Sequence, residues 1–242
     1  MLVIPAIDIR AGKCVRLFQG DYGQETVYGE DPAAMAERWI SQGAQFLHLV
    51  DLDGAREGAP RNRAAIEAVL KRVSVPVQVG GGIRDFAAIG DYLSSGVQRV
   101  ILGTAAYEDP AFLRDACRQR PGRVAVDIAA RKGKAAVAGW TRDTEIRAID
   151  LARRCEEQGA AAIVYTDVQR DGAEQGINLE ETRQVARAVK IPVIASGGVS
   201  TIRDIEALLP LEGDGVVAVI VGRALYAGTL QLPEAIARAR RP

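Results

Sequence analysis

Histidine is almost absent from this chain of 242 residues, in which His48 is the only one. A catalytic triad built on histidine would have to use His48, and a metal site with several histidine ligands is excluded. Acid–base chemistry is therefore expected from carboxylates. The three cysteines, Cys14, Cys117 and Cys155, are an odd number without CxxC spacing. This argues against a disulfide framework or a structural zinc site and favours reduced thiols in the cytoplasm.

An excess of charge of either sign is also missing, since 31 Lys and Arg balance 31 Asp and Glu. A large nucleic-acid surface needs a basic excess, so we expect no nucleic-acid partner, although a local basic funnel for a phosphorylated ligand stays open. No apolar run is long enough to cross a bilayer, and the charged first ten residues are unlike a signal peptide. We expect a cytoplasmic protein with no membrane partner, and a monomer is plausible.

What the chain does contain is an alternation of short β-branched runs with amphipathic helical patterns. Eight such pairs indicate parallel strands joined by crossover helices, and predict an α/β fold, a (β/α)8 TIM barrel. An open, doubly wound sheet is the alternative, but the GxGxxG turn that would favour it is missing after the first strand. The predicted strands are residues 2–8, 46–51, 75–79, 98–102, 122–127, 161–166, 191–195 and 216–221, and the predicted helices are residues 32–42, 61–72, 85–94, 110–118, 145–157, 179–189, 202–209 and 233–240.

The second half of the chain repeats the first. Asp8 and Asp127 lie 119 residues apart, and Gly81 and Gly197 lie 116 residues apart. A near-constant offset between such landmarks indicates two copies of one unit. We therefore predict two (β/α)4 halves, about 1–121 and 122–242, within one barrel domain of residues 1–242.

Two repeat-related aspartates are the candidate catalytic pair. Asp8 and Asp127 end the first and fifth strands, and the carboxyl ends of barrel strands surround the active site. Both follow apolar runs, so partial desolvation could raise a pKa and let one carboxyl act as acid while the other acts as base. Each could instead only cap a turn, but a symmetric pair favours function. Thr166, at another strand end, could hydrogen-bond a sugar hydroxyl, whereas Asp171-Gly172 is also an ordinary turn signal.

Four glycine turns are the clearest ligand signal. Gly80–Gly82 and Gly103-Thr104 follow the third and fourth strands, and Ser196–Gly198 and Gly222-Arg223 follow the seventh and eighth. Glycines at such turns let backbone N–H groups approach an anion closely, beside the N-terminal dipole of the next helix. The loops after strands seven and eight form a recurrent phosphate site in these barrels, so the repeat predicts a second phosphate across the barrel. The alternative is that the glycines only permit tight turns.

Residues 11–31 and 128–144 are long enough to act as lids. In the second of these, Trp140 could stack on a planar ligand group or pack against the barrel rim. His48 lies in mid-strand, on the face opposite Asp51. If Asp51 faces the barrel mouth, His48 faces the helices, and a structural role is favoured for it.

Eight motifs taken together are specific: Ile4–Asp8, Gly12–Leu17, Leu47–Ala55, Gly80–Arg84, Gly139-Trp140, Thr166-Asp167, Ser196–Val199 and Val221–Tyr226. On these motifs the chain resembles the ProFAR isomerase family of histidine biosynthesis over essentially its whole length. The cyclase subunit of imidazole glycerol phosphate synthase is a sister family with the same repeat and paired aspartates. The run Val50–Ala55 is similar to the isomerases rather than to the cyclases.

The resemblance implies an Amadori rearrangement of the aminoaldose ProFAR to the aminoketose PRFAR, a bisphosphorylated ribonucleotide, without a metal or redox cofactor. It implies Asp8 as the general base that removes the C2′ proton and Asp127 as the general acid that helps to open the furanose ring. Thr166 and Asp171 would assist. The implied substrate-binding residues are Arg16, Gly20, Gly81, Gly82, Gly103, Thr104, Trp140, Arg142, Gly172, Ser196, Gly197, Gly198, Gly222 and Arg223.

Two alternatives stay open. A bifunctional relative also converts phosphoribosylanthranilate and uses an arginine resembling Arg142, although the run Gln78–Gly82 resembles the single-function enzymes. A non-catalytic phosphosugar-binding barrel is the second alternative, because Ala173 stands where the family usually has threonine. Loss of one hydrogen bond to a charged group would cost about 1.5–3 kcal/mol if nothing replaced it.

Overall fold

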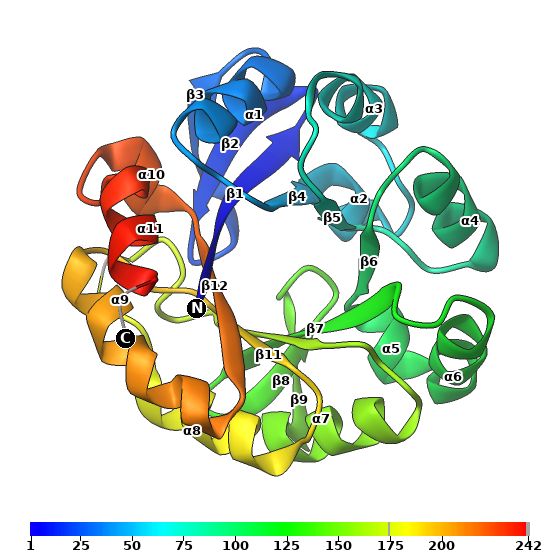
Figure 1. Cartoon of the computed structure of the whole chain (residues 1–242). Coiled ribbons are helices and arrows are strands. Elements are labelled where there is room, and N and C mark those ends of the chain that lie inside the picture. The colour runs from blue at the N-terminus through cyan, green and yellow to red at the C-terminus, as the bar shows by residue number, and fades with distance from the viewer. Residues whose placement is uncertain (174, 241–242) are drawn as a thin grey trace.

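Eight parallel strands close into a barrel in the computed structural model, which describes residues 1–173 and 175–240 (Figure 1). Neighbouring strands follow the order β10-β11-β12-β1-β4-β5-β6-β7, and the pairing of β10 with β7 closes the ring. The predicted (β/α)8 barrel with two repeated halves is confirmed, and the open-sheet alternative is wrong. The barrel strands are β1 (Leu2–Arg10), β4 (Leu47–Asp51), β5 (Val77–Gly80), β6 (Arg99–Leu102), β7 (Val124–Arg131), β10 (Ile163–Asp167), β11 (Val193–Ser196) and β12 (Val216–Val221).

Helices form an outer ring around the strands, and each of the eight predicted helices is present. Asp31 and Asp109 accept N-cap hydrogen bonds from Ala33 and Phe112, and a proline follows each cap at the first helical position. The eight helices are α1 (Pro32–Ser41), α3 (Arg63–Arg72), α4 (Phe86–Ser94), α6 (Pro110–Gln119), α7 (Ala148–Glu157), α8 (Leu179–Ala188), α9 (Ile202–Leu208) and α11 (Leu232–Ala239). Three short helices and a 3-10 helix were not predicted: α2 (Leu52–Glu57), α5 (Thr104–Glu108), α10 (Arg223–Ala227) and η1 (Leu209–Asp214).

Alternation along the strands divides the apolar side chains between two layers. One face packs outward against the helices, where Leu47, Leu49 and Val79 are fully buried. The other face fills the barrel interior with a small cluster: Ile4, Ala6, Ile101, Ala125, Ala162, Val164, Ile194, Ala218 and Ile220. This cluster fills the barrel interior beneath a pocket at the carboxyl ends of the strands. No helix of the described residues is long and apolar enough to span a membrane.

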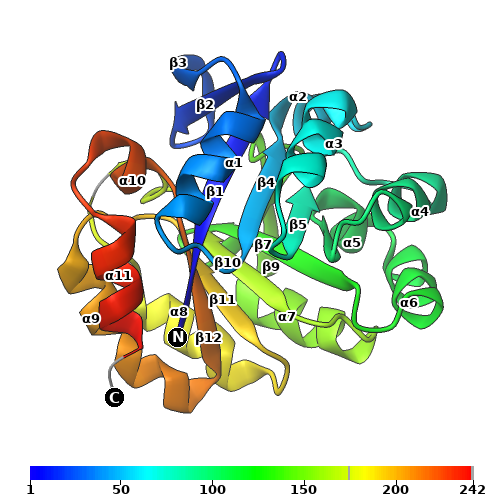
Figure 2. The ribbon, with the colours of Figure 1, turned by 45° about the horizontal axis from the view of Figure 1, so that its top comes forward.

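The two predicted lid loops are largely antiparallel hairpins. The first comprises β2 (Lys13–Phe18) and β3 (Asp21–Gly29), and the second comprises β8 (Lys134–Val137) and β9 (Arg142–Arg147). Strand β2 pairs with β1, and β8 pairs with β7, so each hairpin extends the strand that carries a candidate aspartate. Figure 2 shows β2 and β3 standing beyond the carboxyl end of β1. The repeat therefore extends to these insertions.

Candidate active site

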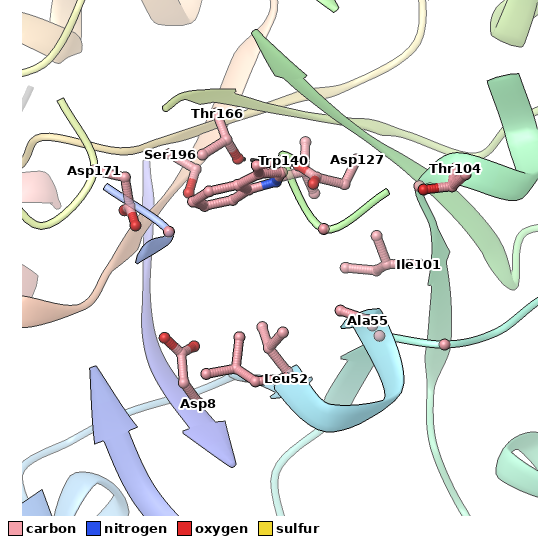
Figure 3. A pocket seen from close by; sticks show the side chains of 18 of the residues that line it. Asp8, Leu52, Ala55, Ile101, Thr104, Asp127, Trp140, Thr166, Asp171 and Ser196 are labelled. Atoms are coloured by element: carbon pink, nitrogen blue, oxygen red, sulfur yellow. Dashed lines mark hydrogen bonds between the residues drawn. The ribbon is translucent and has the colours of Figure 1, made fainter. Parts of the chain in front are cut away.

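A pocket lies at the carboxyl ends of the barrel strands, and most of the predicted site residues line it. In Figure 3, Asp8 and Asp127 face the opening from opposite sides. The pocket brings together 12 of the predicted residues, namely Asp8, Arg16, Gly20, Gly81, Gly82, Gly103, Thr104, Asp127, Trp140, Thr166, Asp171 and Ser196, of which Arg16, Asp171 and Ser196 also line a smaller hollow. That hollow is lined by Gly172, Gly197, Gly198, Gly222 and Arg223 as well.

Asp8 is paired with a buried arginine. Its Oδ2 lies 2.9 Å from Nη1 of Arg16, a residue of strand β2 in the first hairpin. Burial raises the pKa of Asp8 to about 6, and the guanidinium of Arg16 opposes that rise while Asp171 adds to it. A base with a pKa near neutrality that is still mostly ionised is well suited to remove a proton from carbon.

Asp127 has a neutral partner instead. The hydroxyl of Thr166, on the neighbouring strand β10, donates a hydrogen bond of 3.0 Å to its Oδ1. Burial raises the pKa of Asp127 to about 7, the Thr166 hydrogen bond opposes the rise, and Asp171 adds to it. Because no guanidinium is among the causes that hold the pKa of this carboxyl down, Asp127 keeps its proton to a higher pH than Asp8.

Asp171 is the third half-buried carboxyl of the pocket. Burial raises its pKa, Arg16 opposes the rise and Asp167 adds to it. The backbone carbonyl of Asp171 accepts a hydrogen bond of 3.1 Å from the Gln19 N–H, in the turn of the first hairpin. The residue is thus more than a turn signal, since it couples electrostatically to both catalytic candidates and joins the loop after β10 to the first hairpin.

The repeat-related glycines serve close backbone packing. A Cβ at Gly81 would lie 2.1 Å from the carbonyl oxygen of Asp51, and one at Gly197 would lie 2.6 Å from that of Asp167. Both glycines also have positive φ, of 102° and 84°. Tight packing of the backbone is therefore enough to explain why residues 81 and 197 are glycines. An anion-binding role of the same turns is compatible with this packing.

Gly222 and Gly103 are repeat-related but meet different surroundings. A Cβ at Gly222 would lie 1.6 Å from Nη2 of Arg16, whereas a Cβ at Gly103 would find no atom within 4 Å. The guanidinium of Arg16 thus lies against the turn after β12, in the smaller hollow, and reaches Asp8 as well. The hollow therefore has a buried cation beside a glycine turn, an arrangement suited to an anion.

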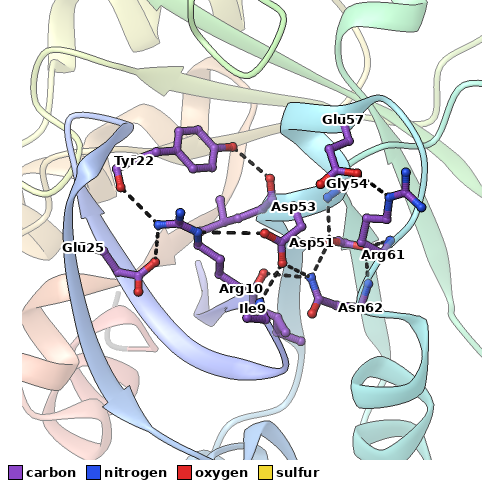
Figure 4. Close-up of polar contacts among 12 residues, drawn as sticks. Ile9, Arg10, Tyr22, Glu25, Asp51, Asp53, Gly54, Glu57, Arg61 and Asn62 are labelled. Carbon is purple, nitrogen blue, oxygen red and sulfur yellow. Dashed lines mark hydrogen bonds and ion pairs between the residues drawn. The ribbon is translucent and has the colours of Figure 1, made fainter.

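Asp51 and Asp167, which lie 116 residues apart in the sequence, have a structural role, because each holds the chain after its strand by hydrogen bonds. Figure 4 shows Asp51, which accepts hydrogen bonds from the backbone of Gly54 and Arg61 and from Asn62. Asp167 similarly binds the Gln169 and Arg170 amides and Asn178. Asn62 and Asn178 lie 116 residues apart, and this spacing could have identified them in the sequence as repeat-related residues. Asp51 is fully buried on the helix side, so it does not face the mouth.

Trp140 covers the pocket and contacts the first hairpin. A Cβ at Gly20 would lie 2.5 Å from the indole Cε3, so the turn between β2 and β3 fits closely against the ring. The backbone of Trp140 has a φ of 68°, which is unusual for a bulky residue and indicates a conformation held by its surroundings. Thr104 accepts a hydrogen bond of 2.9 Å from the Ala138 N–H and so anchors the second hairpin near the same place.

The position of His48 corrects the sequence interpretation, and Arg142 is not brought together with the other predicted site residues. His48 lines the pocket and does not face the helices, because Asp51, on the opposite face of the strand, points outward. Arg142 forms an exposed ion pair with Glu108 on α5 and is absent from the pocket lining of the described residues. A pattern of alternation gives two faces of a strand but cannot say which one is inner.

No group of three or more His, Cys, Asp or Glu side chains within residues 1–173 and 175–240 is arranged to hold a metal ion. The arrangement that is present is a twofold-repeated (β/α)8 barrel with a half-buried carboxyl from each half in one pocket. The chain belongs to the histidine biosynthesis protein family, whose model matches residues 2–231. The family resemblance seen in the sequence is thereby confirmed.

Relatives resemble this chain over nearly their full lengths. The protein from Pelobacter propionicus is 56% identical over 237 residues, covering 98% of this chain and 97% of its own. That from Desulfatibacillum aliphaticivorans is 56% identical over 239 residues, covering 99% and 96%. The Geobacter sulfurreducens protein is 53% identical over 241 residues, covering 100% and 99%. All three are named as imidazole-4-carboxamide isomerases, in a compound name that contains two 5-phosphoribosyl groups.

Proposed function

We propose that this chain is the isomerase its relatives are named for, and that it converts the aminoaldose ProFAR to the aminoketose PRFAR by acid–base catalysis with two aspartates. The observation that carries the proposal is the unlike pairing of two symmetric carboxyls, Asp8 with Arg16 and Asp127 with Thr166. The compound in the relatives' name has a phosphoribosyl group at each end. The two sets of glycine turns, one from each half of the barrel, supply a matching pair of candidate phosphate sites.

In the proposed mechanism the two carboxyls have different tasks. Asp127 donates its proton to the ring oxygen of the ribose as the furanose opens, and Thr166 holds the carboxyl in place. As the C1′–O bond breaks, the amine lone pair forms a C1′=N iminium. Asp8, kept ionised by Arg16, then removes the proton from C2′, and the electrons of that bond neutralise the iminium. The resulting enaminol becomes the ketone as C1′ takes up a proton and the C2′ hydroxyl loses one. The steps move protons and require no external oxidant, because C1′ is reduced as C2′ is oxidised within one molecule. Asp171 assists by adding negative potential near both carboxyls.

The test is turnover of ProFAR by the wild type, by Asp8→Asn and by Asp127→Asn. Each substitution keeps the shape of the side chain and removes its proton chemistry, so we expect kcat to fall by about 10²–10⁴-fold. Asp85→Asn, at an N-cap of α4 outside the pocket, is the matched control and should keep its activity. Near-full kcat in either site variant would remove that residue from the mechanism, and no turnover by the wild type would overturn the proposal.

The two remaining functional hypotheses are weaker. Conversion of phosphoribosylanthranilate was suggested by Arg142, which pairs with Glu108 outside the pocket in this structure. We therefore propose a single substrate, and the same assay with phosphoribosylanthranilate should give no product. A non-catalytic sugar-phosphate barrel was suggested by Ala173. It would show tight binding of ProFAR with no product, whereas the half-buried, paired aspartates favour catalysis.

A further inference from the structure

Three polar side chains form a chain of hydrogen bonds inside the barrel, next to the pocket. They come from neighbouring strands at one level, since His48 of β4 is in register with Gln78 of β5, which is in register with Arg99 of β6. Gln78 is completely buried, and the His48 ring is 9% exposed and lines the pocket. Neither Gln78 nor Arg99 has a task in the mechanism proposed above.

The direction of the hydrogen bonds follows from what each group can do. Arg99 can only donate, and its Nε and Nη2 lie 3.1 and 2.5 Å from Oε1 of Gln78. The carboxamide oxygen of Gln78 must therefore face Arg99, which turns the NH2 group toward His48. That NH2 group can only donate, and it lies 2.9 Å from Nδ1 of His48. Nδ1 must accept, so the single proton of a neutral imidazole is on Nε2.

The surroundings also keep the imidazole neutral. Burial, together with the charges of Arg16 and Arg99, lowers the pKa of His48 to about 3. The guanidinium of Arg99 is itself held in place, with its Cζ 5.6 Å from the centre of the Phe46 ring. The chain of hydrogen bonds therefore has a fixed cation at one end and a fixed, uncharged ring at the other.

We propose that Arg99 and Gln78 are positioning residues that lock His48 in the Nε2–H tautomer, so that His48 offers the substrate a permanent hydrogen-bond donor. The atom it would recognise is a hydroxyl or carbonyl oxygen of the substrate in the pocket between Asp8 and Asp127. A ring locked in this way cannot take a proton during turnover, so the acid–base work stays with the two aspartates. The role in catalysis rests on the proposed function, but the tautomer does not.

The tautomer can be measured directly because the chain has a single histidine. In 15N-histidine-labelled wild-type protein, we expect one pyrrole-like signal, from Nε2, and one pyridine-like signal, from Nδ1, that stay constant from pH 5 to 8. Gln78→Glu replaces the donor by a carboxylate that can only accept, so the proton should move to Nδ1. Gln98→Glu changes an exposed side chain one residue before Arg99 and should leave both signals unchanged.

Turnover gives the second readout. If the locked donor contacts the substrate, Gln78→Glu should lower kcat/KM about tenfold, the loss expected for one hydrogen bond, while Gln98→Glu should not. Should Gln78→Glu fail to fold, Arg99→Met replaces it, because the freed carboxamide can rotate and both tautomers should then appear. A wild-type Nδ1–H signal, a titration between pH 5 and 8, or unchanged signals in the folded variant would overturn the lock. Confirmed signals without turnover would overturn the proposed function alone.

Discussion

At the residue scale, the two central aspartates differ mainly in the partner that each one meets. Asp8 has the guanidinium of Arg16 at 2.9 Å, and Asp127 has the hydroxyl of Thr166 at 3.0 Å. The cation favours the ionised form of its neighbour more strongly than the neutral donor does. The two carboxyls occupy symmetric positions in the repeat, but their different partners give them different proton affinities.

Gly222→Ala tests the position of Arg16. The new Cβ would lie 1.6 Å from Nη2, so the guanidinium must move away from Asp8, and the pKa of Asp8 should rise. We expect the acid limb of the pH dependence of kcat/KM to shift to higher pH. The matched control is Gly103→Ala, which has a similar backbone conformation, with φ and ψ of −107° and −100° against −111° and −104°, and open space around the new Cβ. If the acid limb of the kcat/KM profile lay at the same pH in the two variants, that result would contradict the role given to Arg16.

The sequence was informative about residues wherever the repeat supplied a second copy. Asp8 and Asp127, and Gly81 and Gly197, could be picked out by their common spacing. His48 and Arg142 have no such counterpart, and their directions depend on which face of a strand is inner and on how a hairpin pairs. The partners Gln78 and Arg99 could not be seen in the sequence, because hydrogen bonds between neighbouring strands depend on barrel register.

At the scale of elements, the eight main strands and helices followed from periodicity and caps, whereas the hairpins did not. Strand β3 is mostly exposed and polar, so it lacks the alternation that identifies a strand. The short helices α5 and α10 begin directly at the glycine turns Gly103 and Gly222, where sequence analysis recognised only turns. These elements depend on contacts with the barrel rim rather than on local patterns.

Gly20→Ala tests the contact between the two hairpins. The substitution introduces a Cβ 2.5 Å from the indole of Trp140 at a φ of +75°, so the ring should be displaced and substrate KM should rise severalfold. Gly12→Ala is the control, because its φ is +77° but its Cβ would have no neighbour within 4 Å. Acrylamide quenching of tryptophan fluorescence should increase for Gly20→Ala only, since Trp39 is buried elsewhere. Equal quenching in the two variants would show that the contact is unimportant.

At the scale of the whole molecule, we propose that residues 1–242 form one domain, joined by the β6–β7 and β12–β1 pairings between the halves. A single cooperative unfolding transition would support this.

The carboxyls of the pocket should also set the pH dependence of the free energy of unfolding. The pKa values of Asp8, Asp127 and Asp171 are raised, so the folded state binds their protons more tightly than the unfolded state does.

Stability should therefore decrease as the pH rises from about 4 to about 7, the interval between the unfolded and folded pKa values. Asp127→Asn removes one of these groups and should reduce the loss of stability between pH 5 and pH 8 by on the order of 2 kcal/mol. Urea denaturation at the two pH values measures the difference. Asp85→Asn, outside the pocket, should behave like the wild type, and the same behaviour in Asp127→Asn would contradict the burial argument.

The most direct test of the central claim, that one aspartate works ionised and the other protonated, is the pH dependence of kcat/KM for ProFAR. The account predicts a bell-shaped profile that rises as Asp8 loses its proton near pH 6 and falls as Asp127 loses its proton near pH 7. The two apparent values belong to the coupled pair. A rate that stays constant from pH 5 to pH 9 would contradict the account.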